Sequence, residues 1–334
     1  MRMELQDTFD LAVRMMNIPS ITGTELEIGN FLASHLTNAG YRVEKQEVTP
    51  GRFNVMAYAG TPRILFCTHI DTVPPVIEVR EDKHFLYGRG ACDAKGIAAA
   101  MLNAGDRLRS SGIDDFGFLL VVGEERSGDG ARAANALKWD TEFVIVGEPT
   151  GNKLARAQKG TLMVEISVQG KAAHSGYPDA GVSAIEGLWS VLNDCTQTDW
   201  GNDPVLGQGT VNIGKFNGGE AINIIPAFAS ASVMMRTIVP RRDVEFRMRE
   251  IVGSRARMEI IAGTDPHLMH VVDGFETTVV SFGSDVPYLG RVGKPLLAGP
   301  GSILDAHTAN EKINKQELQA GIELYERLAR KLLS

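Results

Sequence analysis

Cysteine is scarce in this 334-residue chain, and its scarcity excludes disulfide-rich and zinc-finger proteins. The only three cysteines are Cys67, Cys92 and Cys195, and their spacing provides neither a disulfide framework nor a zinc-finger pattern. We therefore expect a reduced, cytoplasmic protein. Cys67 and Cys92 are interpreted as small hydrophobic residues packed in the core.

Clusters of basic residues and long apolar runs are also missing. The chain has 34 basic and 41 acidic residues, a net charge of −7, and its lysines and arginines form no stripe. Nucleic-acid binding and attraction to anionic membranes are therefore not expected. The charged first residues lack the apolar core of a signal peptide, and no apolar run is long enough to span a bilayer.

Short apolar runs alternate with helical patterns at both ends of the chain. Residues 64–68, 116–122 and 143–146 are continuous apolar runs that predict buried strands. Helices are predicted over 5–16, 24–40, 94–108, 131–137 and 315–333. This pattern predicts an α/β domain with a mostly parallel sheet flanked by helices. We assign residues 1–157 and 264–334 to it.

The character of the sequence changes between these two parts. Alternating patterns predict strands at 161–169, 209–216, 227–239 and 257–262, with helices at 180–192 and 241–252. The order is β-α-β-β-α-β, which is the ferredoxin-like unit. We therefore expect a second domain inserted at residues 158–263.

Acids and an imidazole follow the predicted core strands. They are His69, Asp71, Asp93, Glu124, Glu125 and Glu148. Ligands in open α/β sheets bind where strands end at their carboxyl edge, so these side chains are expected to meet there. Taken alone, each acid is better explained by a helix cap or a surface turn, and a strand-end histidine is explained equally well by a turn. It is much less plausible that all of these residues follow the strands of one sheet by chance.

Carboxylates gathered at one edge would repel each other unless a cation lies between them. A divalent metal removes the repulsion, and a carboxylate that bridges two metals explains more acids than one metal needs. Glu124 and Glu125 are neighbours on a strand end and face different ways, so one can bind metal while the other acts as a general base. His307, in the loop at 299–311, is the best remaining ligand candidate.

The sequence resembles the M20 family of di-zinc metallopeptidases and deacylases over nearly its whole length. The motifs that carry the resemblance are THIDTVP at 68–74, GRGACDAKG at 88–96, GEE at 123–125, GEPT at 147–150, and GPG leading to AHT at 299–308. The resemblance implies a zinc-exopeptidase-like catalytic domain, with the inserted domain serving as lid and dimerisation domain.

The resemblance also implies a role for each site residue. Asp93 would bridge two divalent metals, zinc foremost, with cobalt or manganese as alternatives. His69 and Glu148 would complete one metal site, and Glu125 and His307 the other. Glu124 would be the general base, and Asp71 would orient His69. The peptide bond after Asp93 is expected to be cis.

In the inserted domain, GKAAHS at 170–175 matches the lid motif of the family. His174 would polarise the scissile carbonyl, commonly across a dimer; an ordinary surface histidine is the alternative. Asn223 and Arg236 would hold the substrate carboxylate. The family usually has an aspartate two residues before this arginine, whereas this chain has Met234, so Arg236 would lack that charge partner.

Together these features predict a metal-dependent hydrolase of an N-acyl amino acid, most similar to acetylornithine deacetylase. An M20-type dipeptidase or carboxypeptidase, or an enzyme similar to succinyl-diaminopimelate desuccinylase, is the alternative. A metal-dependent binding protein without turnover is a third interpretation, which an intact Glu124 and His174 disfavour. The expected substrate is a small N-acyl amino acid or dipeptide, and the expected assembly is a homodimer through the inserted domain.

Overall fold

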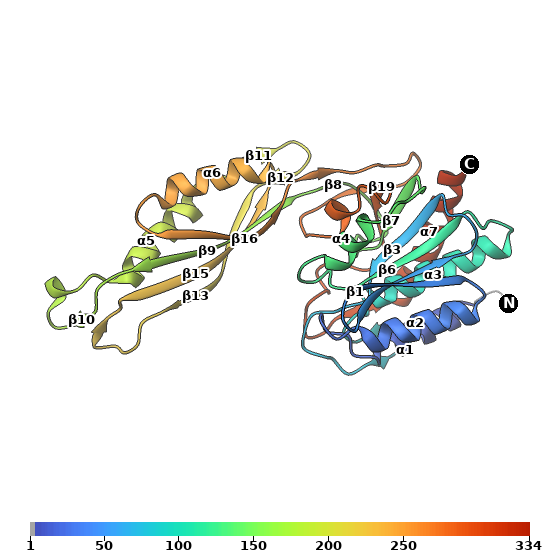
Figure 1. Cartoon of the computed structure of the whole chain (residues 1–334), viewed down its shortest axis with the longest axis horizontal. Helices are drawn as coiled ribbons and strands as arrows, with labels where there is room; N and C mark the ends of the chain where they lie inside the picture. The colour runs from blue at the N-terminus through green and yellow to red at the C-terminus, as the bar shows by residue number, and fades with distance from the viewer. Residues whose placement is uncertain (1–3) are drawn as a thin grey trace. The chain divides into compact units, whose positions relative to one another are not determined.

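A computed structural model describes residues 4–334, which divide into two compact units (Figure 1). The first unit contains the chain up to Arg156 together with Met269–Thr278 and Ser284–Ser334. The second unit contains Ala157–Leu268 and Val279–Gly283. It therefore extends beyond the expected boundary at residue 263. The reason is strand pairing: His267 and Leu268 pair with Gln158 and Ala157.

The first unit is built on a six-stranded mixed sheet with the order β1-β2-β6-β3-β7-β19. Strands β6, β3, β7 and β19 run parallel, while β1 and β2 are antiparallel at one edge. The bounds are β1 Arg42–Thr49, β2 Arg52–Tyr58, β3 Ile64–His69, β6 Phe116–Val121, β7 Phe143–Val146 and β19 Lys294–Leu297. Strands β3 and β6 are buried along their whole length, as continuous apolar runs predict.

Five helices of this unit surround the sheet: α1 Leu5–Met16, α2 Leu26–Asn38, α3 Lys95–Ser110, α4 Asp129–Asn135 and α7 Lys315–Leu333. Helix α3 packs against α1, α7 and β3, and α2 packs against β1 and β2. Most of α3 is buried because it is rich in alanine and glycine, which let it lie close to its neighbours. Rings of Phe66, Phe116, Phe118 and Tyr325 meet in the core.

Short strands form two further small sheets. They are β4 Arg80–Glu81, β5 Phe85–Tyr87 and β20 Lys312–Asn314 in one small sheet, and β8 Leu154–Gln158, β17 His267–Leu268 and β18 Thr277–Val280 in another. Cys67 and Cys92 are buried, as expected; Cys195 is buried too, and all three cysteines are free. In the part of the chain that the structure describes, no helix is long and apolar enough to cross a membrane.

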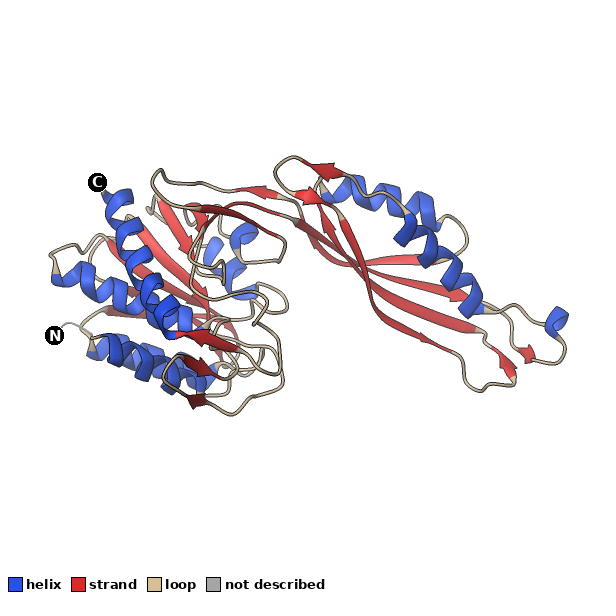
Figure 2. Cartoon of the chain, turned by 180° about the vertical axis from the view of Figure 1, so that it is seen from behind, coloured by secondary structure: helices blue, strands red, loops and turns tan. Residues whose placement is uncertain are grey.

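The second unit has the order β9-α5-β13-β15-α6-β16, which is the ferredoxin-like order. Figure 2 shows its two long helices together on one side of its strands. Its elements are β9 Gly160–Gln169, α5 Ala184–Gln197, β13 Thr210–Gly218, β15 Phe228–Thr237, α6 Arg241–Val252 and β16 Arg257–Thr264. The strands form an antiparallel sheet in the order β13-β15-β9-β16. Alternate residues of β9 and β15 are buried because the two helices cover one face of this sheet. Two small strand pairs, β10 Ala173–His174 with β14 Ile224–Ile225, and β11 Asn202–Asp203 with β12 Gly207–Gln208, lie outside it.

Candidate metal centre

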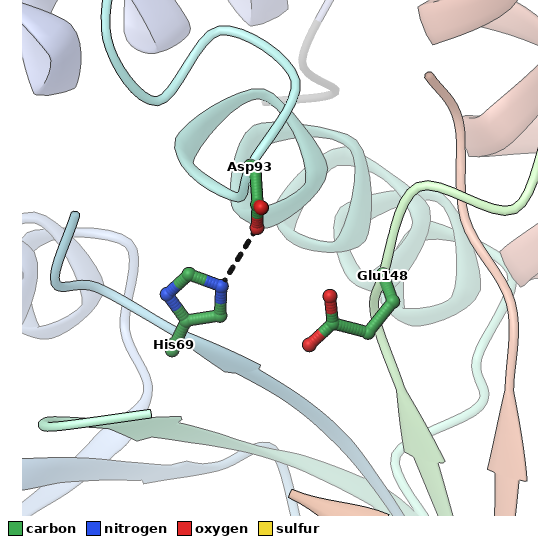
Figure 3. Close-up of side chains that lie close together, drawn as sticks. All are labelled: His69, Asp93 and Glu148. Carbon is green, nitrogen blue, oxygen red and sulfur yellow. Dashed lines mark hydrogen bonds and ion pairs between the residues drawn. The ribbon is translucent and has the colours of Figure 1, made fainter. Parts of the chain in front are cut away.

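The carboxyl ends of three parallel strands bring the predicted ligands together in the first unit. His69 is the last residue of β3, Glu124 and Glu125 follow β6, and Glu148 follows β7. Asp93 lies two residues before α3, and the Asp93–Ala94 peptide bond is cis, as expected. Figure 3 shows His69, Asp93 and Glu148 converging from these segments.

Two groups of side chains could each hold a metal ion, and they share Asp93. One group is His69, Asp93 and Glu148, and the other is Asp93, Glu125 and His307; within each, the ligand atoms lie within 4.8 Å of one another. Asp93 Oδ1 is 2.9 Å from His69 Nε2, whereas Asp93 Oδ2 is 3.3 Å from His307 Nε2. Each oxygen of Asp93 therefore faces a different histidine. This is the arrangement that a bridging carboxylate requires.

His307 approaches Asp93 from the loop that follows β19. Its Nε2 atom is 3.0 Å from a carboxylate oxygen of Glu125. The residue has a φ of 61°, a left-handed conformation that is uncommon for residues other than glycine. Backbone strain of this kind is concentrated at functional sites, where the surrounding structure maintains it.

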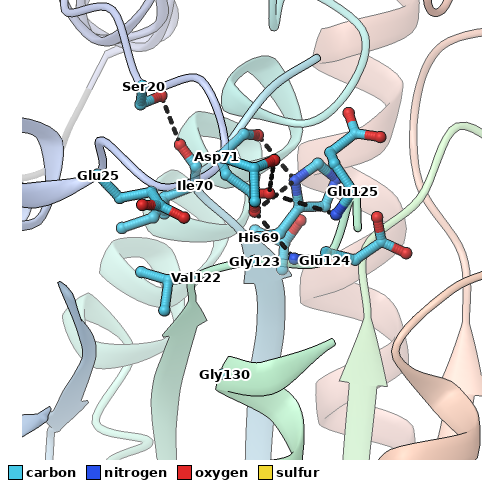
Figure 4. Close-up of polar contacts among 12 residues, drawn as sticks. Ser20, Glu25, His69, Ile70, Asp71, Val122, Gly123, Glu124, Glu125 and Gly130 are labelled. Carbon is cyan, nitrogen blue, oxygen red and sulfur yellow. Dashed lines mark hydrogen bonds and ion pairs between the residues drawn. The ribbon is translucent and has the colours of Figure 1, made fainter. Parts of the chain in front are cut away.

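Asp71 lies against His69, as expected, and it also contacts the turn that follows β6. His69 Nδ1 lies 2.9 Å from the main-chain carbonyl oxygen of Asp71 and 3.6 Å from its carboxylate, so the carbonyl is the nearer partner. The carboxylate also accepts hydrogen bonds from the backbone N–H groups of Glu124 and Glu125, at 3.1 and 3.2 Å (Figure 4). The Thr22 hydroxyl donates to the same carboxylate at 2.7 Å. Asp71 therefore ties the end of β3 to the turn that carries the two glutamates.

Crowding of acids perturbs the protonation of the site. Burial raises the pKa of Glu124 and of Glu148 well above the usual value, and other carboxylates nearby raise both further. Hydrogen bonds to Asp93 and Glu125 raise the pKa of His307 to about 10. Burial acts to raise the pKa of Asp93, but its hydrogen bonds with His307 and His69 outweigh burial and hold it well below its usual value. Without metal, bound protons and imidazolium groups neutralise the negative charge of these carboxylates. Divalent cations between the same carboxylates would neutralise that charge equally well.

Glu311 is a site residue that sequence reasoning missed. It is fully buried, and its carboxylate accepts hydrogen bonds from Arg89 and from three backbone N–H groups, including that of Asp93. Arg89 and Glu311 are 222 positions apart. No local pattern marks this acid, because its partners lie so far away in the sequence.

Asp285 is a second buried acid without an expected role. In the part of the chain that the structure describes, its Oδ1 atom has no hydrogen-bond partner. Burial raises the pKa of Asp285 to about 7, and its charge in turn contributes to the raised pKa of Glu124 and Glu148. No local sequence pattern singled out this acid, because its burial depends on the folded structure.

The predicted residues of the second unit fall into two places. His174 and Asn223 are exposed neighbours: His174 pairs with Ile224, and the Asn223 carbonyl accepts the Ser175 N–H at 3.0 Å. His174 Nδ1 accepts the Gly176 N–H at 3.1 Å, which leaves Nε2 to carry the proton of the neutral ring.

Arg236 lies near the opposite end of β15, where it pairs with Thr161 and Thr210. Eight residues of extended strand, about 25 Å, separate it from Phe228 at the start of β15. One chain therefore does not bring Arg236 together with His174 and Asn223. Arg236 is half-buried, burial lowers its pKa, and within residues 4–334 no carboxylate pairs with its guanidinium group. Met234, two residues earlier, offers none.

Comparison with known proteins assigns the chain to a family. The model of peptidase family M20/M25/M40 matches residues 65–331. The chain belongs to this family. A peptidase M20 domain-containing protein of Schizosaccharomyces pombe is 38% identical over 331 residues, which cover 94% of this chain and 82% of the relative. A protein of Aspergillus clavatus named "Probable carboxypeptidase" is 36% identical over 362 residues, covering 96% of this chain and 87% of the relative.

Solved structures show the same fold. A tripeptidase from Staphylococcus aureus superposes with a TM-score of 0.83 at 22% identity, covering 99% of this chain and 100% of that one. The family match makes the protein a hydrolytic enzyme of the M20 peptidase family. The finer expectation of an acetylornithine deacetylase-like enzyme is not what the names of these relatives indicate. They favour the peptidase alternative.

Proposed function

We propose that the protein is a metal-dependent exopeptidase that cleaves the peptide bond next to a free C-terminal carboxylate. Two ligand groups that share Asp93, with Glu124 beside them, are the main support for this activity. The relative named "Probable carboxypeptidase" supports a peptide substrate with a C-terminal carboxylate.

The first unit supplies the hydrolytic residues. His69, Asp93 and Glu148 would hold one divalent ion, and Asp93, Glu125 and His307 the other, zinc being suited to this mixture of imidazole and carboxylate. When bound, such ions activate water and polarise a carbonyl group. Glu124 would accept the proton of the attacking water and deliver it to the leaving amine. Burial raises the pKa of Glu124, which helps this side chain to hold the proton between the two transfers.

The second unit supplies the residues that hold the substrate. Arg236 would bind the substrate carboxylate, since its planar guanidinium can donate two parallel hydrogen bonds. Met234 leaves that guanidinium free of a competing acid. His174 would polarise the scissile carbonyl through Nε2, with Asn223 beside it. Arg236 lies near one end of β15, whereas His174 and Asn223 lie on segments beyond the other end. We therefore infer that these two serve the catalytic unit of a second copy, in a homodimer formed through the second unit.

Deacylation of an N-acyl amino acid is the second candidate. Such substrates, including N-acetylornithine and N-succinyl-diaminopimelate, have an amide bond next to a free carboxylate. Arg236, which pairs with no acid among the residues that the structure describes, would bind that carboxylate equally well. The two candidates therefore differ only in the group on the other side of the scissile bond.

The decisive experiment is hydrolysis by zinc-loaded protein of dipeptides, tripeptides and the two N-acyl amino acids, each with and without a chelator. We expect chelator-sensitive cleavage of peptides, and little cleavage of the same peptides with an amidated C-terminus. Parallel loading with cobalt and manganese tests the choice of metal. Cleavage of the N-acyl amino acids alone would favour the deacylase. Bound metal without turnover on any substrate would point to a binding protein.

A further inference from the structure

A buried ion pair lies beside the proposed metal centre. The Arg89 guanidinium donates from Nη1 to Glu311 Oε2 at 2.6 Å, and the Arg89 and Glu311 side chains are 4% and 0% exposed. Neither residue belongs to a ligand group. Pairs of this kind contribute little net stability, because removing both charges from water offsets their attraction. Stability alone therefore does not explain why two charges are placed here.

The second oxygen of Glu311 holds the backbone of the bridging aspartate. Oε1 accepts hydrogen bonds from the N–H groups of Gly90, Cys92 and Asp93, at 2.9, 3.1 and 3.1 Å. One carboxylate oxygen thus fixes the turn that ends at Asp93. The main-chain carbonyl of Glu311 also accepts the Gly88 N–H at 3.0 Å, at the start of the same turn.

The pair also connects the other segments that carry ligands. Arg89 Nε donates to the carbonyl of Pro75 at 3.2 Å, and Pro75 lies six residues after His69. Glu311 itself follows His307 by four residues on the same loop. The segments of His69, Asp93 and His307 therefore meet at one buried ion pair.

We propose that Glu311, paired with Arg89, is a positioning residue that orients Asp93 so that its two oxygens serve both metal sites. This inference rests on the proposed metal centre. Partners that hold a ligand without touching the metal fix the orientation of the ligating group, and their removal typically costs about 10- to 100-fold in metal affinity or activity. Glu311 acts through the backbone of Asp93 rather than through the ligand oxygens.

The Glu311→Gln variant separates this role from simple packing. Glutamine has nearly the same shape, but only one of its two terminal groups accepts hydrogen bonds. The glutamine oxygen can accept the backbone N–H groups of the turn only if the glutamine NH2 group faces the Arg89 guanidinium. Both of those groups are donors, so no hydrogen bond forms between them. The variant therefore loses either the hydrogen bond with Arg89 or the hydrogen bonds with the turn, while the volume of the side chain stays the same. Glu317→Gln is the matched control, because Glu317 Oε1 also accepts a backbone N–H, that of Gly301 at 3.1 Å, but does not contact the turn.

The test is metal titration of the full chain, wild type and variants, with zinc by competition against a chelator and with manganese by EPR. We expect wild type to bind two ions with an exchange-coupled manganese signal. Glu311→Gln is expected to lose about 10- to 100-fold in affinity for the second ion. It is also expected to lose the coupled signal and to show a lower kcat with little change in KM. Glu317→Gln should match wild type.

Unchanged affinity and an unchanged coupled signal in Glu311→Gln would overturn the proposal, even if the variant unfolded at a lower temperature. If that variant does not fold, Arg89→Lys is measured in the same way; it keeps the charge but not the reach to Pro75. A smaller loss of affinity for the second ion is expected there, and no loss would overturn the proposal. Failure of wild type to bind two ions would instead reject the proposed function.

Discussion

Asp93 is the residue on which the site depends most. Its two oxygens face two histidines from segments far apart in the sequence, and its backbone is held by Glu311. Asp71 does for the Glu124–Glu125 turn what Glu311 does for Asp93, because its carboxylate accepts both backbone N–H groups. In this site, buried acids thus position other acids. Burying so many carboxylates costs little free energy only if each oxygen accepts a hydrogen bond or contacts a cation.

Glu124→Gln is expected to keep both metals and lose turnover. The amide keeps the shape but cannot accept the proton of the attacking water, and a general base contributes about 10²- to 10⁴-fold to a rate. Metal content by atomic absorption and kcat on the best substrate measure the two effects. The control is Glu27→Gln in the first turn of α2, which should leave kcat unchanged. Near-normal turnover in Glu124→Gln would contradict the assigned role.

Metal affinity is expected to rise with pH. In the folded, metal-free protein, hydrogen bonds to Asp93 and Glu125 raise the pKa of His307 from 6.5 to about 10. The ring is therefore protonated at neutral pH, and it must release a proton when a metal binds. The affinity should therefore increase with pH below that pKa, by about tenfold per pH unit for one displaced proton. Calorimetry in two buffers with different ionisation enthalpies measures the released protons. Binding without proton release would contradict the prediction.

At the scale of elements, the site depends on how closely α3 lies against the sheet. Gly105 of α3 faces β6: a Cβ atom there would lie 2.4 Å from Phe118 Cζ and 2.8 Å from Phe116 Cε2. Gly147, after β7, is similarly close to Ile97 and Met101 of α3. Small residues at these positions let the helix begin directly beside the strand ends, which places Asp93 near His69.

Gly105→Ala is expected to destabilise the protein. Replacing a helical glycine by alanine gains up to about 1 kcal/mol from helix propensity, but overpacking a core costs about 1–3 kcal/mol. The steric cost should exceed the gain in helix propensity, because two buried phenylalanine rings lie so close to the new methyl group. Urea unfolding would report a lower free energy of unfolding. Gly290→Ala is the control, since no atom lies within 4 Å of its Cβ position. A more stable Gly105→Ala variant would contradict the packing.

At the scale of the whole molecule, each unit has a hydrophobic core of its own. The core of the first unit gathers residues from Phe9 to Ala329, and the core of the second gathers residues from Leu162 to Val252. All five proposed metal ligands belong to the first unit. The second unit therefore contributes no residue to either group of metal ligands.

Zinc is consequently expected to stabilise only one of two thermal transitions. A ligand at about 100 times its Kd stabilises the state that binds it by about 2.7 kcal/mol. Calorimetry with and without chelator should move the transition of the first unit and leave that of the second. Fluorescence of Trp139 in the first unit and of Trp200 in the second, each as the single tryptophan, identifies the transitions. Equal shifts of both transitions would contradict this separation.

Much of the fold follows from short-range patterns in the sequence. Continuous apolar runs predicted β3, β6 and β7, and small apolar residues predicted the buried helix α3, because periodicity and residue size are local properties. The same patterns predicted that His69, Asp93, Glu125, Glu148 and His307 could meet, since parallel strands end at one edge of the sheet. The second unit was expected to end near residue 263, whereas its pairing extends further, because that boundary depends on strand partners.

The sequence by itself determined the α/β class, the family and the set of candidate ligands, because these depend on local residue patterns and motifs. Only the tertiary structure decided which partner each buried acid has. It placed the carboxylate of Asp71 on the glutamate turn as well as beside His69, and it paired Glu311 with a segment more than 200 residues earlier. It also separated Arg236 from His174 and Asn223 along β15. Hydrogen bonds between distant segments form only once the chain has folded, so no local pattern encodes them.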